Sequence, residues 1–186
     1  NHSAGEPKPD FSDYKAHGYF SDDHGKTFQL GATVNMPGSN ESTAALLTDD
    51  RLMMNSRNQR GDIKARIVSL SRDGGISWDT TYFDSNLPDP VNEGSLLSMV
   101  RKRRKSLLLF SNAADTTHRN NLMLRFSSDN GRSWNKSILI YAGSEKKASI
   151  DHAAYSDLVL LGKNQVGVLF EKDDYRVIVF TAVAKQ

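Results

Sequence analysis

The stretch Ser71-Arg-Asp-Gly-Gly-Ile-Ser-Trp78 decides how the rest of the chain is interpreted, because two more copies of its pattern occur in the sequence. The copies are Ser21–Phe28 and Ser127–Trp134, and all three read Ser-x-Asp-x-Gly-x-Ser/Thr-aromatic. Their first residues are 50 and 56 positions apart (71 − 21 and 127 − 71). A pattern repeated at a period of roughly 50 residues is typical of propellers and other repeat arrays.

Each octapeptide has the chemistry of a tight hairpin turn. Its glycine can adopt the positive φ that such a turn needs, its aspartate can accept hydrogen bonds from backbone N–H groups, and its aromatic ring can pack beneath the turn. A calcium loop would need a glutamate at its twelfth position, but counting from Asp73 this position is Asp84, and the ligand spacing between them does not fit. We therefore predict structural turns, with no metal and no other cofactor.

The composition excludes several classes of site. The chain has 186 residues, a formal net charge of +2 and no cysteine, so disulfides and thiolate metal sites are ruled out. The apolar runs are far shorter than the roughly 20 residues of a membrane-spanning helix, and no signal-peptide core is visible. The charges are mixed along the chain, and the basic run Arg101–Lys105 is predicted to be a solvated turn. We expect neither a nucleic-acid nor a membrane partner.

Short apolar and β-branched runs bounded by turn residues predict an all-β chain without helices. Two groups of four strands are expected, at 44–47, 51–55, 64–70 and 80–83, then at 96–100, 106–111, 121–127 and 137–141. An incomplete group comes first, at 16–20 and 28–30, and another comes last, at 155–161, 166–170 and 177–183. Each octapeptide joins a third strand to a fourth. Because closed propellers have 4–8 blades, these strands are too few for a ring.

Between the octapeptides, the sequence resembles the sialidase (neuraminidase) family, especially its gut-bacterial members. The resemblance extends from about Tyr14 to Val183. It rests on Asn40–Gln59 with Glu41 and Arg57, on Phe110–Ser127 with Arg119, on Ala154–Leu158 with Tyr155, and on Val168–Glu171 with Glu171.

This resemblance implies a six-bladed β-propeller with Asp-box hairpins. Residues 1–186 would be the C-terminal portion of that single domain: a partial blade, two complete blades, and a last blade whose fourth strand comes from the N-terminus. The family's first substrate-binding arginine and its acid/base aspartate have no match here. We therefore expect an N-terminal half as partner, and no activity of this chain alone.

The implied activity is that of an exo-α-sialidase that releases terminal sialic acid from sialylated glycans with retention. Tyr155 would be the nucleophile and Glu41 its base, Arg57 and Arg119 would bind the substrate carboxylate, and Glu171 would support the missing arginine. The chemistry explains the tyrosine, because a carboxylate nucleophile would be repelled by the carboxylate on the anomeric carbon of sialic acid. A phenol has a pKa near 10, so it needs a base beside it.

Two alternatives stay open at this point. The chain could belong to a sialic-acid-binding or structural propeller that lacks catalysis, although such a protein needs the arginines and not the Tyr155–Glu41 couple. It could instead belong to an intramolecular trans-sialidase, which product analysis would separate from a hydrolase. Glu93 could also reach the sugar from a loop. A secreted, periplasmic or cell-surface location is expected, because the substrates are extracellular.

Overall fold

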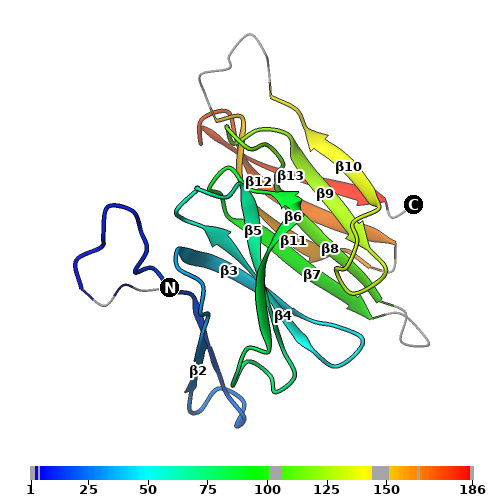
Figure 1. Cartoon of the computed structure of the whole chain (residues 1–186). Helices are drawn as coiled ribbons and strands as arrows, with labels where there is room; N and C mark the ends of the chain where they lie inside the picture. Colours follow the sequence, from blue (N-terminus) through cyan, green and yellow to red (C-terminus); the bar gives the residue numbers. More distant parts are fainter. Residues whose placement is uncertain (1–2, 4, 101–105, 144–150, 163, 185–186) are drawn as a thin grey trace.

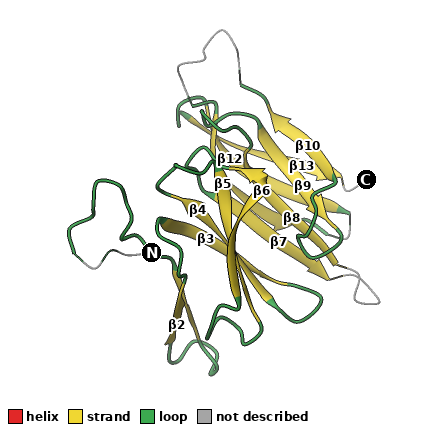
Figure 2. Cartoon of the chain, in the orientation of Figure 1, coloured by secondary structure: helices red, strands yellow, loops and turns green. Residues whose placement is uncertain are grey.

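A computed structural model describes residue 3 and residues 5–100, 106–143, 151–162 and 164–184 of the chain, and all its regular elements are β-strands (Figures 1 and 2). The all-β prediction is therefore confirmed. The run Arg101–Lys105, predicted to be a solvated turn, lies outside the described residues. Within the described ranges, no helix has the length and apolar character needed to cross a membrane.

The strands form four antiparallel sheets in which spatial neighbours are also sequence neighbours. They are β1 (His17–Phe20) and β2 (Gln29–Thr33); β3 (Ser39–Leu46), β4 (Leu52–Asn58), β5 (Ala65–Ser71) and β6 (Thr80–Pro88); β7 (Gly94–Val100), β8 (Ser106–Ala113), β9 (Leu122–Ser127) and β10 (Lys136–Tyr141); and β11 (Ala153–Leu160), β12 (Gln165–Lys172) and β13 (Val177–Ala184). This up-and-down order is that of propeller blades.

One strand extends well beyond its predicted start. β3 begins at Ser39 rather than at residue 44, and its first residues pair with the end of β4, Ser39 opposite Asn58 and Ser42 opposite Ser56. The sequence does not predict this extension, because residues 39–43 are all polar, which is unlike a typical strand. As a result Glu41 lies inside β3, where a register irregularity separates Ser39 from Ser42.

The sheets pack face to face through three apolar clusters, and the first strands β3, β7 and β11 contact one another in succession. Met53 and Val68 of one four-stranded sheet meet Leu96, Leu108 and Phe110 of the next. The other two clusters lie on either side of this one along the series of sheets. Burial of these side chains is what holds successive sheets together.

Each octapeptide is closed by its own serine and aspartate. In the second copy, Ser71 Oγ donates to Asp73 Oδ1 at 2.7 Å and accepts from the Gly75 N–H at 2.8 Å. Asp73 also accepts from the N–H and the hydroxyl of Ser77, at 2.8 and 2.6 Å. The same four bonds recur in the first and third copies. The turn prediction is therefore confirmed.

The second and third turns also dock on the preceding sheet. Ala32 N–H donates to Gly75 O at 3.0 Å, and Trp78 Nε1 donates to Ala32 O at 2.8 Å. A Cβ on Gly31 would lie 2.7 Å from Gly75 O, so this approach requires glycine. In the third turn, Asn130 Oδ1 accepts from Thr48 Oγ1 at 2.9 Å.

The aromatic residues of these motifs differ in their packing. Trp78 and Trp134 pack against buried clusters, as predicted. The prediction is wrong for Phe28, whose side chain is 62% exposed. The physical reason is that, within the described residues, no sheet precedes β1–β2 to cover this ring, which instead makes an edge contact with Tyr19.

The octapeptide aspartates should make stability depend on pH in acid. Hydrogen bonds, above all from the Ser77 hydroxyl, lower the pKa of Asp73 from 3.8 to about 2. A carboxyl whose pKa is lower in the folded state contributes stability above its unfolded pKa, and this contribution is lost as the pH falls through the folded value. We expect Asp73→Asn to lower Tm at neutral pH, and the difference from wild type to shrink as the pH falls from 3.8 to about 2.

Thermal unfolding followed by circular dichroism across this pH range provides the measurement. Asp22→Asn removes an exposed carboxyl at a variable position of the first motif and serves as the control. A difference in Tm between Asp73→Asn and wild type that stays constant down to the lowest pH would contradict the hydrogen-bonding role of the ionised carboxylate.

Candidate active site

The residues singled out from the sequence gather at the end of the sheets opposite the octapeptide turns. Glu41 and Tyr155 lie near the starts of first strands, β3 and β11, and Arg57 lies near the end of a second strand, β4. Arg119 precedes a third strand, β9. In antiparallel sheets these positions share one end, whereas the octapeptides follow the third strands and share the other.

Tyr155, Glu41 and Arg57 form a closed group of hydrogen bonds. Tyr155 Oη donates to Glu41 Oε1 at 2.5 Å, although the two residues are 114 positions apart. Arg57 Nη1 donates to Glu41 Oε2 at 2.7 Å and to Tyr155 Oη at 2.9 Å. The structure thus brings together a phenol, a carboxylate and a guanidinium from two different sheets.

The surroundings keep the Tyr155 phenol protonated at neutral pH. Partial burial raises its pKa above 10.0, and the hydrogen bond to Glu41 acts in the same direction. Arg57 and Arg119 oppose this rise, because a cation stabilises the phenolate. A Tyr155 nucleophile would therefore need a proton acceptor, and Glu41 is already hydrogen-bonded to its hydroxyl.

Arg119 is held beside this group. Its Nη2 donates to Val91 O at 3.1 Å, and its Nη1 donates to Tyr175 Oη at 2.7 Å. The centre of its guanidinium lies 5.7 Å from the centroid of the Tyr155 ring, within cation–π range. Arg57 and Arg119 therefore flank one phenol, and each is also paired with a carboxylate, Glu41 at 2.7 Å and Asp151 at 3.8 Å.

Tyr175 was not predicted from the sequence. It lies in the β12–β13 turn, where it follows Asp173 and Asp174 as the last of three non-glycine residues with positive φ (51°, 59° and 62°). Its hydroxyl donates to Asp151 at 2.5 Å, and burial together with that carboxylate raises its pKa to about 12. Such backbone conformations persist only where the surroundings fix them. The only sequence signal was an Asp-Asp pair between two strands.

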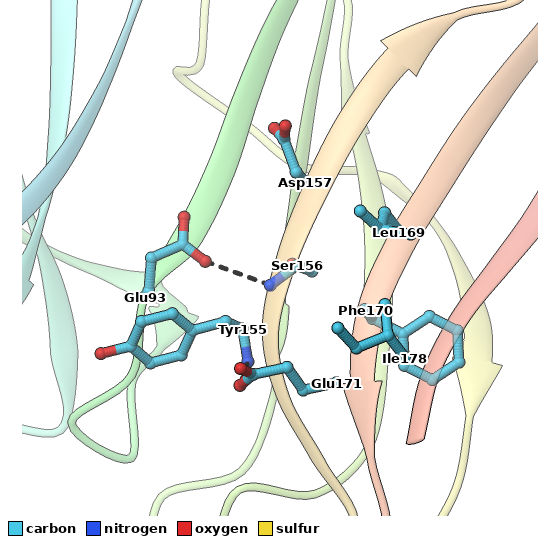
Figure 3. A pocket seen from close by; sticks show the side chains of 8 residues that line it. All are labelled: Glu93, Tyr155, Ser156, Asp157, Leu169, Phe170, Glu171 and Ile178. Carbon is cyan, nitrogen blue, oxygen red and sulfur yellow. Dashed lines mark hydrogen bonds between the residues drawn. The ribbon is translucent and has the colours of Figure 1, made fainter. Parts of the chain in front are cut away.

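A pocket of about 310 Å³ opens on one side of Tyr155 (Figure 3). Its walls are formed by Glu93, Tyr155, Ser156, Asp157, Leu169, Phe170, Glu171 and Ile178. Glu171 Oε2 accepts the Tyr155 N–H at 3.2 Å, and Glu93 Oε2 accepts the Ser156 N–H at 3.1 Å. The predicted support of a further arginine by Glu171 stays a prediction, because no residue of this chain matches that arginine.

Glu93 lies in this wall rather than on an open loop. Burial raises its pKa to about 7; Arg66 opposes this rise, whereas the negative charges of Glu41 and Asp157 add to it. Among the described residues, no cluster of three or more His, Asp or Glu side chains could hold a metal ion.

A buried charged pair near the site was not predicted from the sequence. Arg66 and Asp89 have fully buried side chains whose charged atoms lie 3.2 Å apart. Arg66 stands in a strand whose other residues are mostly apolar or small, and nothing in a local pattern distinguishes a buried arginine from a solvated one.

The arrangement suits the attack of a phenol on an anionic substrate. Glu41 can accept the phenol proton, and the nearby cations can bind a carboxylate or stabilise a phenolate.

Comparisons with known proteins match this chain to a family. A sequence profile described as a BNR repeat-like domain matches residues 3–168. A sialidase from Micromonospora viridifaciens is 34% identical over 163 residues, which make up 85% of this chain and 24% of that protein. The chain thus spans about a quarter of the length of this relative.

Solved structures with a similar fold also include proteins named as sialidases. The chain superimposes on the Hadza microbial sialidase Hz136 with a TM-score of 0.75 and 30% sequence identity, covering 89% of this chain and 31% of the other. A leech intramolecular trans-sialidase gives a TM-score of 0.72 at 20% identity, over 89% of this chain and 27% of the other, and this likeness concerns the fold alone. These similarities confirm the β-propeller fold.

The hydrogen-bonded group predicts opposite shifts in the ionisation of Tyr155. Glu41→Gln removes the negative charge that favours the neutral phenol, so we expect the pKa of Tyr155 to fall. Arg57→Met removes a cation that favours the phenolate, so the pKa should rise. Ultraviolet difference titration measures phenolate formation, and the titration of Tyr155→Phe, subtracted from each curve, isolates this residue. Shifts in the same direction for both variants would show that the group does not form in solution.

Proposed function

The chain belongs to the sialidase family, and on this premise we propose that the protein containing it is an exo-α-sialidase that releases terminal sialic acid from glycoconjugates with retention. The observation that carries the proposal is the 2.5 Å hydrogen bond from Tyr155 to Glu41, with Arg57 on both partners. Glu41 takes the phenol proton as Tyr155 attacks the anomeric carbon, the glycosidic C–O bond breaks, and an acid/base residue supplied by the rest of the propeller protonates the leaving oxygen. Water, deprotonated by that same residue, then cleaves the bond between Tyr155 and the sugar, and the phenolate recovers its proton from Glu41.

A neutral nucleophile suits this substrate, whose anomeric carbon carries a carboxylate. An attacking carboxylate would face that charge at close range, whereas Tyr155 loses its proton to Glu41 only as the bond forms. Arg57 and Arg119 bind the substrate carboxylate, because a guanidinium stays charged and matches a carboxylate with two parallel N–H groups. Arg57 has a second role, since its contact with Tyr155 Oη stabilises the developing phenolate.

We also propose that the N-terminal half of the same six-bladed propeller completes the site. That half would supply the acid/base aspartate, a third arginine supported by Glu171, and a strand beside β13. β13 is an edge strand of its three-stranded sheet, and its side chains Ile178 and Phe180 are 69% and 55% exposed. Both features support this proposal, because an apolar edge strand favours pairing with another strand. The chain alone would then be inactive. Because sialylated glycans lie outside cells, we propose a secreted, periplasmic or cell-surface location.

The alternatives differ in what they require of the site. A non-catalytic sialic-acid-binding or structural propeller has no need of a phenol hydrogen-bonded to a carboxylate, so the Tyr155–Glu41 contact favours an enzyme. Hydrolysis and intramolecular transfer share the first attack by tyrosine. They differ in the released product, which is free sialic acid for a hydrolase and an anhydro sugar for a trans-sialidase.

We expect Tyr155→Phe in the full-length protein to lower turnover of natural or alkyl sialosides by at least about 100-fold, since the nucleophile is lost. The loss should be smaller for aryl sialosides, whose good leaving groups depart with less assistance. Steady-state kinetics on both substrate classes measure the effect, and NMR of the first-formed anomer tests retention.

Tyr141→Phe is the matched control for this test. Its hydroxyl also donates to a carboxylate, Asp173 at 3.0 Å, but it is not part of the Tyr155–Glu41–Arg57 group. The control should keep normal turnover. Unchanged turnover in Tyr155→Phe would rule out the proposed nucleophile, and specific binding of sialosides without any turnover by the wild-type protein would favour the binding alternative.

A further inference from the structure

The backbone around Tyr155 departs from regular strand pairing. Along β11 and β12, Ala153 pairs with Lys172 and Ser156 pairs with Phe170, so three steps on β11 match two on β12 (156 − 153 against 172 − 170). This register shift places one extra residue in β11 at Ala154–Tyr155. A bulge of this kind turns a side chain to a new direction and leaves backbone groups without partners in the ladder.

Side chains are hydrogen-bonded to the backbone at three consecutive residues of β11, which is an edge strand of its sheet. Asn92 Nδ2 donates to Ala154 O at 2.8 Å, Glu171 accepts the Tyr155 N–H, and Glu93 accepts the Ser156 N–H. Figure 3 shows the Glu93 contact beside the Tyr155 ring. Two of the three side chains come from adjacent residues in the loop before β7, more than sixty positions earlier in the sequence.

That loop, residues Asp89–Glu93, also contacts Arg119 and the residue that follows Arg57. Val91 O accepts from Arg119 Nη2 at 3.1 Å. Asp89 Oδ2 accepts the N–H of Asn58, the residue that follows Arg57, at 3.1 Å. A single five-residue segment is therefore hydrogen-bonded to Arg119 itself and to the backbone next to Arg57 and Tyr155.

The loop is held in one conformation by buried polar contacts. Asp89 Oδ1 accepts the Asn92 N–H at 2.7 Å, and the buried Arg66 donates both to Asp89 and to the carbonyl of Asn92. Val91 has a φ of 64°, which a β-branched residue adopts only when its surroundings enforce it. Burying the Arg66–Asp89 pair incurs a desolvation cost, so such a pair is a poor source of stability but a suitable source of fixed geometry.

We propose that the loop Asp89–Glu93 is the positioning element of the site, in which Asn92 and Glu93 fix the β11 bulge that aims Tyr155 at its target. This inference rests on the proposed function, because it assigns a role in presenting the nucleophile. Asn92 and Glu93 are positioning residues: they act through the backbone at 154–156 and do not react. Burial raises the pKa of Glu93, and the hydrogen bond from the Ser156 N–H opposes this rise because it stabilises the carboxylate.

The test compares variants of the full-length protein. Glu93→Ala removes the acceptor for the Ser156 N–H, and it should lower kcat by about 10- to 100-fold while changing KM by less than about threefold, because the nucleophile is misplaced but the arginines remain. Glu93→Gln keeps an oxygen acceptor and should restore kcat. Asn92→Ala removes the donor to Ala154 and should repeat the effect, which provides a second variant if Glu93→Ala does not fold.

Ser95→Ala is the matched control. Ser95 Oγ also links β7 to β11, accepting the Leu158 N–H at 3.2 Å and donating to Asp157 at 2.8 Å, but beyond the bulge. Its loss should lower Tm and leave kcat unchanged. In a Tyr155→Phe background, Glu93→Ala should have no further effect on the residual rate, because both changes act on the same step.

The inference fails if Glu93→Ala and Asn92→Ala lower kcat no more than Ser95→Ala, or if Glu93→Gln does not restore it. This outcome is distinguishable from failure of the proposed function, in which Tyr155→Phe itself has no effect. Hydrogen exchange of the Ser156 amide tests the contact between Glu93 and Ser156 without an activity assay. Exchange should become faster in Glu93→Ala and stay unchanged in Ser95→Ala. Equal exchange rates in the two variants would overturn the proposal.

Discussion

Contact between the first strands of successive sheets, β3, β7 and β11, is the constraint on which the rest of this structure depends. The two four-stranded sheets and the last sheet meet in part through these strands, and no single sheet carries all of Tyr155, Glu41 and Arg57. Glu41 comes from β3, Tyr155 from β11, and Glu93 from the residue just before β7. A shift of one sheet against its neighbour would therefore break the Tyr155–Glu41 contact even if every strand kept its own pairing.

Electrostatic balance explains why these residue types occur together. Two arginines and the Glu41 carboxylate lie close to a phenol that is itself neutral, and these charges shift the pKa of Tyr155 in opposite directions. The Arg57 guanidinium contacts the base and the phenol at once, so it is placed to stabilise whichever of them carries the negative charge. In this way a proton can pass between Tyr155 and Glu41 without leaving an unpaired charge.

The sequence predicted much of the fold because its signals are local. The octapeptides encode their own hydrogen bonds, and the apolar runs between them form strands near the expected positions. It also named Tyr155, Glu41 and Arg57, which the structure brings into contact. Arg66, Asp89, Asn92 and Tyr175 were missed, because each acts through partners far away in the sequence and none belongs to a recognisable pattern. Glu93 was singled out, but its contact with the backbone of Ser156 could not be predicted from the sequence, because the two residues are 63 positions apart.

The separation of the two ends of each sheet has a consequence for how such a protein can change over generations. At one end, the second and third octapeptide turns are hydrogen-bonded to the preceding sheet. Gly31 lies so close to the carbonyl of Gly75 that a side chain at this position would collide with it. Insertions there would disturb assembly. At the other end, Glu41, Arg57 and Tyr155 stand in strands, and two connections bond to the neighbouring sheet: the loop before β7, and the β8–β9 connection, in which Arg119 O accepts the Ala153 N–H at 2.8 Å. Variation in length and composition is therefore expected at positions of either end that make none of these contacts, so that the surface can change while the scaffold is kept.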